Sequence, residues 1–278
     1  MKRNTFKILD IKIDSLDIAE AELQLAELME LDKPSIVCTP NTEFLVKAQH
    51  DDEFRKILNT KSKLNLPDSY GLLWAARFLT LPVPKIPVVR EIIILLEWIL
   101  SLILLPIFSR FYHYPLKEKI SGSDFIWDIA RFAAKNKYRV FLYGGAPVVA
   151  EQTALKLQTE VFDLRIAGMF HGDLTREDEA IEAMKKSRAD ILLVCLGAPL
   201  QEKWLDINLA KTGCKIGVGL GGTFDFIAKI VPRAPRFMQK SGLEWLYRLF
   251  VEPKRFKRQF ALPHMALLVL RDKLVDKA

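Results

Sequence analysis

Short apolar runs alternate with longer polar segments along the second half of the chain. The apolar runs cover residues 138–145, 164–170, 189–197 and 214–222. Runs of this length, bounded by Gly or polar residues, predict strands that are buried on both faces. The segments between them predict helices, because Pro147 suits a first helical turn and the stretch 176–188 places acids early and bases late. Such alternation predicts a doubly wound, mainly parallel α/β sheet.

The N-terminal part of the chain adds further elements to the same domain. It predicts strands near 6–13, 35–38 and 63–66 and a helix over 17–31. A chain of 278 residues can build one large core with appendages, and no internal repeat divides it. We therefore expect one catalytic α/β domain over residues 1–231, followed by a basic helical appendage over 232–278.

A strongly apolar segment at 86–112, IPVVREIIILLEWILSLILLPIFSRFY, lies within a hydrophobic insertion at 86–117. The nineteen residues between Arg90 and Arg110 would reach across a bilayer core at about 1.5 Å per residue. A simple span is disfavoured, because Glu97 would be costly in lipid and Pro106 would break a long helix. We expect a re-entrant hairpin or a pair of interfacial helices dipping into the membrane. The alternative is a buried contact in a homo-oligomer.

The formal net charge of +7 comes entirely from the C-terminal appendage. Residues 232–278 hold eleven Lys or Arg against four Asp or Glu, whereas residues 1–231 are balanced. A segment of this kind suits an anionic membrane surface, nucleic acid or solvent alone. The aromatic and apolar residues at 245–250 precede the basic run KRFKR, and this pairing favours lipid over nucleic acid. The last stretch, 260–274, either continues that surface or packs as a helix on the domain.

Several other classes of site find no support in the sequence. The three cysteines, Cys38, Cys195 and Cys214, lie far apart, and the four histidines are scattered, so we expect no disulfide framework and no metal site. Neither GxGxxG nor GxxxxGK[ST] is present, which disfavours the standard dinucleotide and P-loop sites. The charged N-terminus differs from a signal peptide, and we expect a cytoplasmic location.

Polar and Gly residues follow the predicted strands where ligands bind in open α/β sheets. Because the carboxyl ends of parallel strands share one edge, we expect these residues to surround a ligand that suits helix N-termini, such as a diphosphate. They are Thr39, Asn41, Asp68, Gly144, Gly145, Gln201, Gly221, Gly222 and Asp225. Taken singly, each has an ordinary structural explanation. The pattern alone therefore indicates an α/β domain with a phosphate-binding edge and goes no further.

Asp68, in LNLPDSYG at 64–71, has two interpretations at this point. Asp is a preferred N-cap residue, and a helix is predicted to begin directly after it. The same position is also the place for a catalytic base at the sheet edge. A carboxylate at a helix start is expected to stay ionised, which suits a base.

Several segments together resemble the WecG/TagA/CpsF family of bacterial glycosyltransferases. They are TPNTEFL, LPDSYGLLWAAR, SGSDF, FLYGGAP, LVCLGAPLQEKW, GVGLGGTFDFIA and RAPRFMQKSGLEWLYRLFVEPKRFKRQ, and they run through nearly the whole chain except residues 86–117. The resemblance implies an inverting, metal-independent enzyme that uses no cofactor. It implies transfer of an N-acetylmannosamine-type sugar, a hexose or a uronic acid from a UDP-sugar to an undecaprenyl-diphosphate-linked sugar. Such reactions serve cell-surface polysaccharide or teichoic acid synthesis.

The resemblance also implies roles for individual residues. Asp68 matches the family's proposed general base, Thr39 and Asn41 match polar residues of the same pocket, and Gln201 matches an active-site Gln. Asp225 matches an acid beside the nucleotide. Lys119 stands where the family has Arg, which keeps the charge but loses the planar two-point grip on phosphate. Three basic positions match a tail thought to fold over the site at the membrane: Arg248, Arg255 and Arg258.

These implications place the protein at the cytoplasmic face of the cell membrane. Its expected partners are the UDP-sugar donor, the polyprenyl-diphosphate-linked acceptor and an anionic membrane surface. Nucleic acid is not an expected partner. The alternative function is a non-catalytic nucleotide-binding adaptor at the membrane surface.

Overall fold

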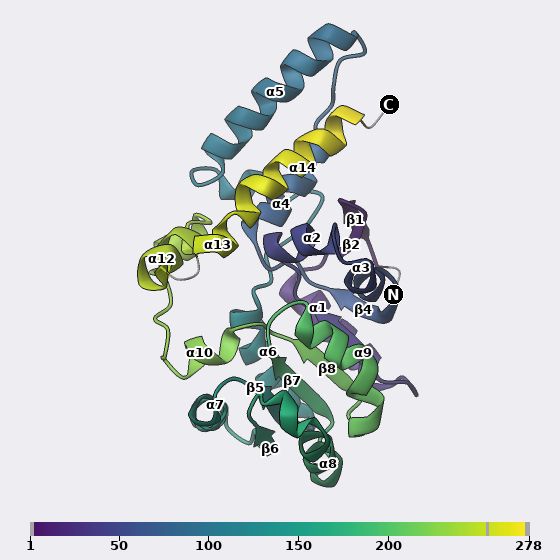
Figure 1. The fold of residues 1–278 in the computed structure, drawn as a ribbon, viewed down its shortest axis with the longest axis vertical. Helices are drawn as coiled ribbons and strands as arrows, with labels where there is room; N and C mark the ends of the chain where they lie inside the picture. The colour runs from purple at the N-terminus through teal and green to yellow at the C-terminus, as the bar shows by residue number, and fades with distance from the viewer. Residues whose placement is uncertain (1–2, 254–255, 276–278) are drawn as a thin grey trace.

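The computed structural model describes residues 3–253 and 256–275, and its centre is a six-stranded parallel sheet (Figure 1). The strand order is β4-β3-β8-β7-β5-β6, with every neighbouring pair parallel. The strands are β3 (Ser35–Cys38), β4 (Ser62–Asn65), β5 (Arg139–Gly144), β6 (Arg165–Phe170), β7 (Ile191–Cys195) and β8 (Ile216–Gly219). The predicted strands other than the one near 6–13 thus form one sheet, and the predicted doubly wound α/β fold is confirmed.

Helices cover both faces of the sheet. On one face the core contains residues of α1 (Ile18–Met29), α6 (Gly122–Asn136), α7 (Pro147–Glu160) and α10 (Thr223–Ile227). On the other face it contains residues of α2 (Thr42–Ala48), α3 (Asp52–Lys56), α4 (Tyr70–Thr80), α8 (Glu177–Ser187) and α9 (Leu200–Thr212). Alternate strand residues serve the two cores, so Leu193 faces the first core and Leu192 the second.

The single strand expected near 6–13 is instead a hairpin. Its strands, β1 (Thr5–Ile8) and β2 (Ile11–Asp14), are antiparallel and joined through Leu9 and Asp10, both with positive φ. An Asp tolerates this backbone conformation better than most residues, but the apolar alternation continues across the turn and hides it from sequence inspection. The remaining short elements are a π-helical turn at Ile57–Lys61 and 3₁₀ turns at Ser109–Tyr112 and Leu174–Arg176.

The insertion forms one long helix, α5 (Pro87–Leu104), and not the expected hairpin or helix pair. The helix ends just before Pro106, as the proline predicts. The chain then returns through the 3₁₀ turn Ser109–Tyr112. The helix that lies beside α5 is α14 (Ala261–Val275), from the far end of the chain (Figure 1). Within the described residues, no helix is long and apolar enough to cross a membrane.

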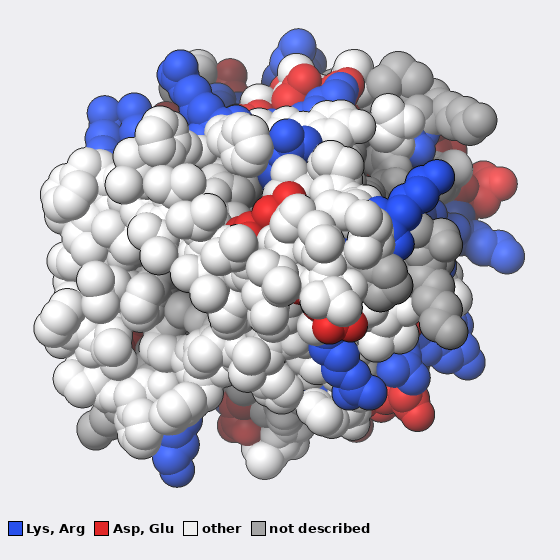
Figure 2. Space-filling view, turned by 90° about the horizontal axis from the view of Figure 1, so that it is seen from above, with Lys and Arg blue, Asp and Glu red and all other residues white. Residues whose placement is uncertain are grey.

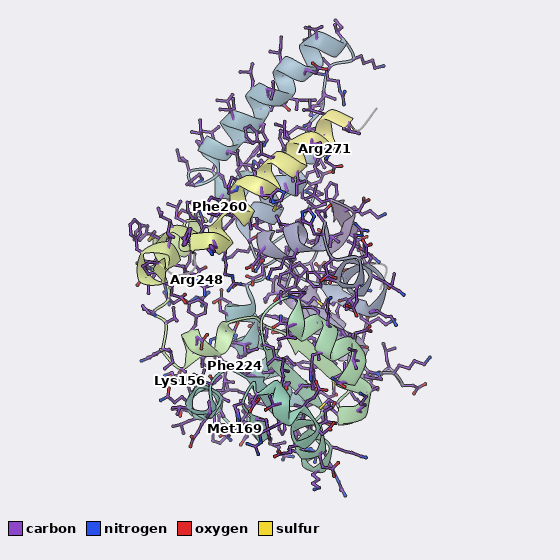
Figure 3. The ribbon with its side chains drawn as sticks, viewed as in Figure 1. Lys156, Met169, Phe224, Arg248, Phe260 and Arg271 are labelled. Atoms are coloured by element: carbon purple, nitrogen blue, oxygen red, sulfur yellow. The ribbon has the colours of Figure 1, made fainter. Side chains whose placement is uncertain are left out.

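The C-terminal appendage is helical and returns to the domain. It comprises α11 (Arg236–Lys240), α12 (Glu244–Val251), α13 (Phe256–Gln259) and α14. Helix α14 packs on α2, α4 and α5, and Met265, Ala266 and Val269 are buried there. Of the two interpretations of 260–274, the structure therefore shows a helix packed on protein. Apolar residues of this stretch are still exposed, such as Leu267 in α14 and Phe260 just before it (Phe260 is labelled in Figure 3).

Candidate active site

A cavity of about 280 Å³ lies at the carboxyl ends of β3, β4 and β8 and extends beneath the C-terminal helices. Its walls come from loops far apart in the sequence and from the tail. The predicted site residues that line it are Thr39, Asn41, Asp68, Lys119, Gly221, Gly222, Arg248 and Arg258. The sheet edge therefore brings together most, but not all, of the candidate residues.

Small and hydroxyl side chains set the near wall of the cavity. Asn41 caps α2, with its Oδ1 accepting hydrogen bonds from the backbone N–H groups of Glu43 (3.0 Å) and Phe44 (3.2 Å). Thr39 is buried and donates to the carbonyl of Gly219 (2.9 Å), which joins the ends of β3 and β8. Gly71 allows α4 to approach α2, since a Cβ there would lie 2.7 Å from Thr42 Oγ1. These contacts fix the spacing of the strand ends around the cavity.

Asp68 is not the N-cap of α4, because that position belongs to Ser69, whose Oγ accepts from the backbone N–H of Leu72. The backbone N–H of Asp68 donates to Pro40 O at 2.7 Å, which holds the residue against the β3 loop. Its side chain lines the cavity. Of the two sequence interpretations of Asp68, the capping one is wrong.

The surroundings of Asp68 change its ionisation. The pKa of its carboxyl is raised to about 7 from the ordinary 3.8, chiefly by burial and to a smaller extent by the Glu244 carboxylate. The Lys119 ammonium, the Ser121 hydroxyl and the Gly122 backbone N–H act in the opposite direction. The expectation that a helix start would simply keep the carboxylate ionised is therefore wrong. A group with this pKa exchanges protons near neutral pH, which is suited to general base catalysis.

The segment that carries Lys119 enters the site beside Asp68. The backbone N–H of Ile120 donates to Pro67 O at 2.8 Å, so residues 119–121 run alongside the strand end that precedes Asp68. Lys119 Nζ lies 5.3 Å from the centre of the Tyr70 ring, within cation–π range. Ser121 begins α6, whose first N–H groups face this region. The cationic side chain predicted by the resemblance is thus present in the cavity.

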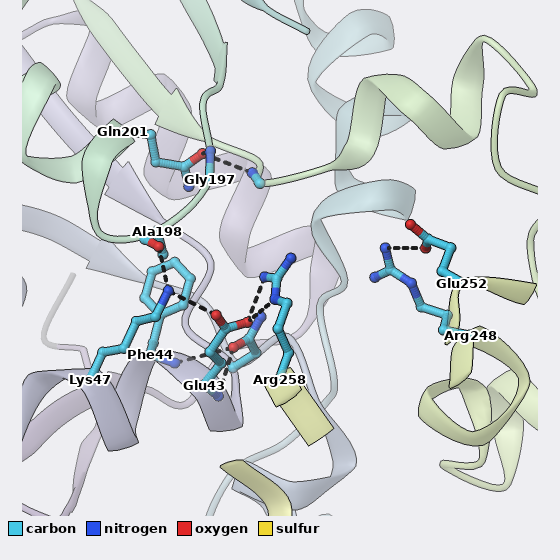
Figure 4. A network of polar contacts seen from close by, with 11 residues as sticks. Glu43, Phe44, Lys47, Gly197, Ala198, Gln201, Arg248, Glu252 and Arg258 are labelled. Carbon is cyan, nitrogen blue, oxygen red and sulfur yellow. Dashed lines mark hydrogen bonds and ion pairs between the residues drawn. The ribbon is translucent and has the colours of Figure 1, made fainter. Parts of the chain in front are cut away.

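Two arginines of the tail also line the cavity, and Figure 4 shows the carboxylates with which they pair. Arg258 forms two hydrogen bonds with Glu43 Oε2, at 2.8 Å from Nε and 2.5 Å from Nη2. Arg248 pairs with Glu252 at 3.3 Å and lies 4.6 Å from the centre of the Phe226 ring. The third predicted arginine, Arg255, lies outside the described residues.

Gln201 does not line the cavity but lies fully buried behind it. Its Oε1 accepts hydrogen bonds from the backbone N–H groups of Gly197 (3.2 Å) and Gly221 (2.9 Å), and its Nε2 donates to Glu202 Oε1 at 2.6 Å (Figure 4). It therefore ties the loop after β7 to the loop after β8. The structure places Gln201 in a positioning arrangement, not in contact with the cavity.

Asp225 and the Gly144–Gly145 turn also lie outside the cavity wall. Burial raises the pKa of Asp225 and the charge of Arg248 lowers it, which places this acid near the tail arginine. Gly144, at φ +120°, packs against the end of β7, since a Cβ there would lie 2.3 Å from Cys195 O. Close packing of two strand ends explains this glycine without a ligand.

Three cavity-region residues were not candidates in the sequence. Ser121 contacts Asp68, and Glu244 lies close enough to raise its pKa. Arg233 forms two hydrogen bonds with Asp124, at 2.5 and 2.7 Å, and lies 3.7 Å from Glu244. Glu244 belongs to the segment GLEWLY, but only the return of the tail over the sheet edge reveals that it faces Asp68.

Comparison with known proteins identifies the family. Residues 6–99 and 103–278 match the model described as the glycosyl transferase WecG/TagA/CpsF family. The chain belongs to this family. The match also runs through most of the insertion, which corrects the expectation that residues 86–117 lie outside the resemblance. As a family member, the protein is a glycosyltransferase.

Two curated relatives carry the same name, N-acetylglucosaminyldiphosphoundecaprenol N-acetyl-beta-D-mannosaminyltransferase. The one from Bacillus subtilis (strain 168) is 34% identical over 164 residues, which cover 59% of this chain and 64% of the relative. The one from Bacillus spizizenii (strain ATCC 23059 / NRRL B-14472 / W23) is 26% identical over 265 residues, covering 93% of this chain and 90% of the relative.

Proposed function

We propose that this protein transfers a sugar from a UDP-sugar to a polyprenyl-diphosphate-linked sugar, with inversion at the anomeric carbon. The transferred sugar is of the N-acetylmannosamine type, a hexose or a uronic acid. The names of the two Bacillus relatives support the acceptor class. The reaction serves cell-surface polysaccharide or teichoic acid synthesis.

In the proposed reaction, Asp68 acts as the general base. Its carboxylate takes the proton from the acceptor hydroxyl as that oxygen attacks the anomeric carbon. The new carbon–oxygen bond forms on the side opposite the nucleotide, and the electron pair of the breaking bond leaves with the diphosphate oxygen of UDP. A positioned base of this kind contributes on the order of 10²–10⁴ in rate.

The departing diphosphate needs positive charge in a site with little water. The cavity offers this charge through Lys119, Arg248 and Arg258, and through the first N–H groups of α6. Among the described residues, no group of three His, Cys, Asp or Glu side chains is placed to hold a metal ion. We therefore propose that side chains and helix N–H groups, and not a divalent cation, stabilise the leaving UDP.

We also propose that the end of the molecule formed by α5 and α14 docks on the cytoplasmic face of the cell membrane. The outward side of α5 is apolar and exposed, with members such as Ile92, Ile99 and Ile103. Seen from that end, the molecule presents a broad area without charged side chains, and Lys and Arg side chains border it together with some Asp and Glu (Figure 2). An apolar face bordered by basic residues suits an anionic lipid surface.

One observation carries this proposal. At the sheet edge, the Asp68 carboxyl lines a polar cavity that cationic side chains also line. The direct test is a donor screen in which UDP release is measured with UDP-N-acetylmannosamine, UDP-glucose and UDP-uronic acids, against a short-chain polyprenyl-diphosphate sugar. We expect release with one donor class that persists in EDTA. Release from none of them would favour the adaptor, and strict dependence on Mg²⁺ would contradict the proposed charge stabilisation.

A further inference from the structure

A second, apolar groove opens beside the catalytic cavity. Its volume is about 250 Å³, slightly below the roughly 300–1,000 Å³ of typical small-ligand sites. Five parts of the chain form it: the start of α2, the start of α4, the end of α5, the turn between α11 and α12, and the start of α14. The insertion and the tail therefore build this groove together with the sheet domain.

The walls of the groove offer very little polarity. Among the fourteen lining residues, the hydroxyl side chains are Thr42 and Ser241. Trp74, buried in one wall, directs its ring N–H away to Ser101 Oγ at 2.9 Å. None of these fourteen described residues is charged, whereas the catalytic cavity is lined by Asp68, Lys119 and others. Its occupant is therefore an apolar chain.

The groove and the cavity are continuous. Six residues line both of them: Thr42, Gly71, Leu105, Gly242, Trp245 and Leu262. An amphiphile with a charged head and an apolar tail would meet Lys119, Arg248 and Arg258 on one side of this boundary. It would meet Trp74, Leu102 and Met265 on the other. A prenyl diphosphate has this distribution of charge and hydrocarbon.

The groove also leads toward the proposed membrane surface. Leu102, Leu105 and Pro106 line it at the C-terminal end of α5. Their sequence neighbours Ile103 and Ile107 are exposed, at 62% and 69%. The groove therefore lies beside exposed apolar residues at the end of α5 on one side and joins the catalytic cavity on the other. A lipid held in the bilayer can extend its first units along this groove.

We infer that this groove binds the diphosphate-proximal isoprene units of the acceptor lipid while the catalytic cavity holds its diphosphate and sugar. The inference rests on the proposed function, because it assigns a second subsite to the same acceptor. The limited volume means that only the first units are held and that the rest of the lipid stays in the membrane. The groove would thus set the reacting sugar at a fixed distance from the bilayer.

The test compares the binding of farnesyl diphosphate with that of inorganic diphosphate by calorimetry, without donor and without membrane. We expect the full-length protein to bind farnesyl diphosphate at least about tenfold more tightly, because several CH₂ and CH₃ groups leave water in the groove. Leu102→Trp, which fills the groove from α5, should remove this preference and leave the affinity for inorganic diphosphate unchanged. Leu243→Trp should do the same from the tail side.

Ile103→Trp is the matched control, since it adds the same ring to the exposed side of the same helix turn. It should keep the preference for farnesyl diphosphate. Equal affinity for the two compounds in the wild-type protein would overturn the inference, as would an equal loss in Ile103→Trp and Leu102→Trp. Binding is measured apart from turnover, so the two proposals fail separately. A preference for farnesyl diphosphate without sugar transfer would contradict the proposed reaction. Sugar transfer without that preference would contradict the proposed binding of isoprene units in the groove.

Discussion

Strand β7 and helix α5 are both built from apolar runs, but β7 is buried and α5 is largely exposed. All five residues of β7, ILLVC, are buried between the two helical layers. Helix α5 buries one side against α4 and α14 and leaves most of its apolar residues exposed. An apolar run therefore shows that a segment avoids water, but it does not show whether protein or lipid replaces the water.

The polar residues of α5 reveal which side faces the protein. Trp98 donates from its ring to Ala266 O at 2.9 Å, Ser101 accepts from Trp74, and Glu97 pairs with Lys273 at 3.4 Å. Arg90 donates to the carbonyls at the end of α14. These groups all point toward the protein, whereas Glu91, in the first turns of the helix, is exposed. The Glu97 charge that argued against a simple membrane span is thus paired within the protein, and the opposite side of the helix is apolar.

The comparison predicts that charges on the outer face of α5 affect membrane binding alone. The double variant Ile99→Glu with Ile103→Glu should lower affinity for anionic vesicles at least about 100-fold, since two exposed apolar side chains are replaced by charges. Sedimentation with phosphatidylglycerol vesicles measures this. Turnover of a soluble short-chain acceptor should stay the same. Unchanged vesicle binding would show that the membrane contact lies elsewhere, with a contact between protein copies as the next explanation.

A second prediction concerns the contact of α14 with α5 and with the end of α4. Lys273 is buried, and its Nζ donates to Phe78 O (2.5 Å) and Leu81 O (3.1 Å) in addition to its pairing with Glu97. Lys273→Met removes these hydrogen bonds and leaves the Glu97 carboxylate without its cationic partner, so it should lower the free energy of unfolding by about 2–3 kcal/mol. Thermal denaturation measures the loss. Arg271→Met, on the exposed side of the same helix, is the control and should change little.

The smallest predicted effects lie in the pH profile of the catalytic cavity. A base must be ionised, so kcat/KM should rise with pH through the Asp68 pKa of about 7 and level off above it. Lys119→Met removes a charge that lowers this pKa and should move the inflection to higher pH. Glu244→Gln removes a charge that raises it and should move the inflection to lower pH. Shifts of about half a pH unit are expected for each.

Glu182→Gln on α8, whose carboxylate pairs with Lys186 at the surface, serves as the distant control for these profiles. Its inflection should match that of the wild-type protein. If the inflections of Lys119→Met and Glu244→Gln both shifted in the same direction, the inflection would belong to a group other than Asp68.

The sheet could be predicted from the sequence because its strands are short, continuous apolar runs separated by helices. Each of the strands from β3 to β8 lies within or next to an expected range. The β1–β2 hairpin could not, because its turn at Leu9–Asp10 lacks Gly and the apolar alternation runs through it. The contact between α5 and α14 could not either, since nothing local pairs residue 98 with residue 266.

The candidate site was partly predictable for the same reason. Thr39, Asn41 and Asp68 follow parallel strands, and parallel strand ends converge on one edge. Gln201 lies behind the cavity because its side-chain amide forms a hydrogen bond with the loop after β8. The N-cap of α4 is Ser69 and not Asp68. The effect of Glu244 on Asp68 depends on the path of the tail. The positions of the strands can be inferred from local pattern, whereas these side-chain contacts depend on tertiary packing.

The central claim is that the Asp68 carboxylate activates the acceptor hydroxyl. The most direct measurement is the kcat of Asp68→Asn with the donor identified by the screen and a soluble acceptor, together with its affinity for UDP. We predict that kcat falls by about 10²–10⁴ while UDP affinity stays within about twofold of wild type. Turnover close to the wild-type value would contradict the assignment of Asp68 as the base.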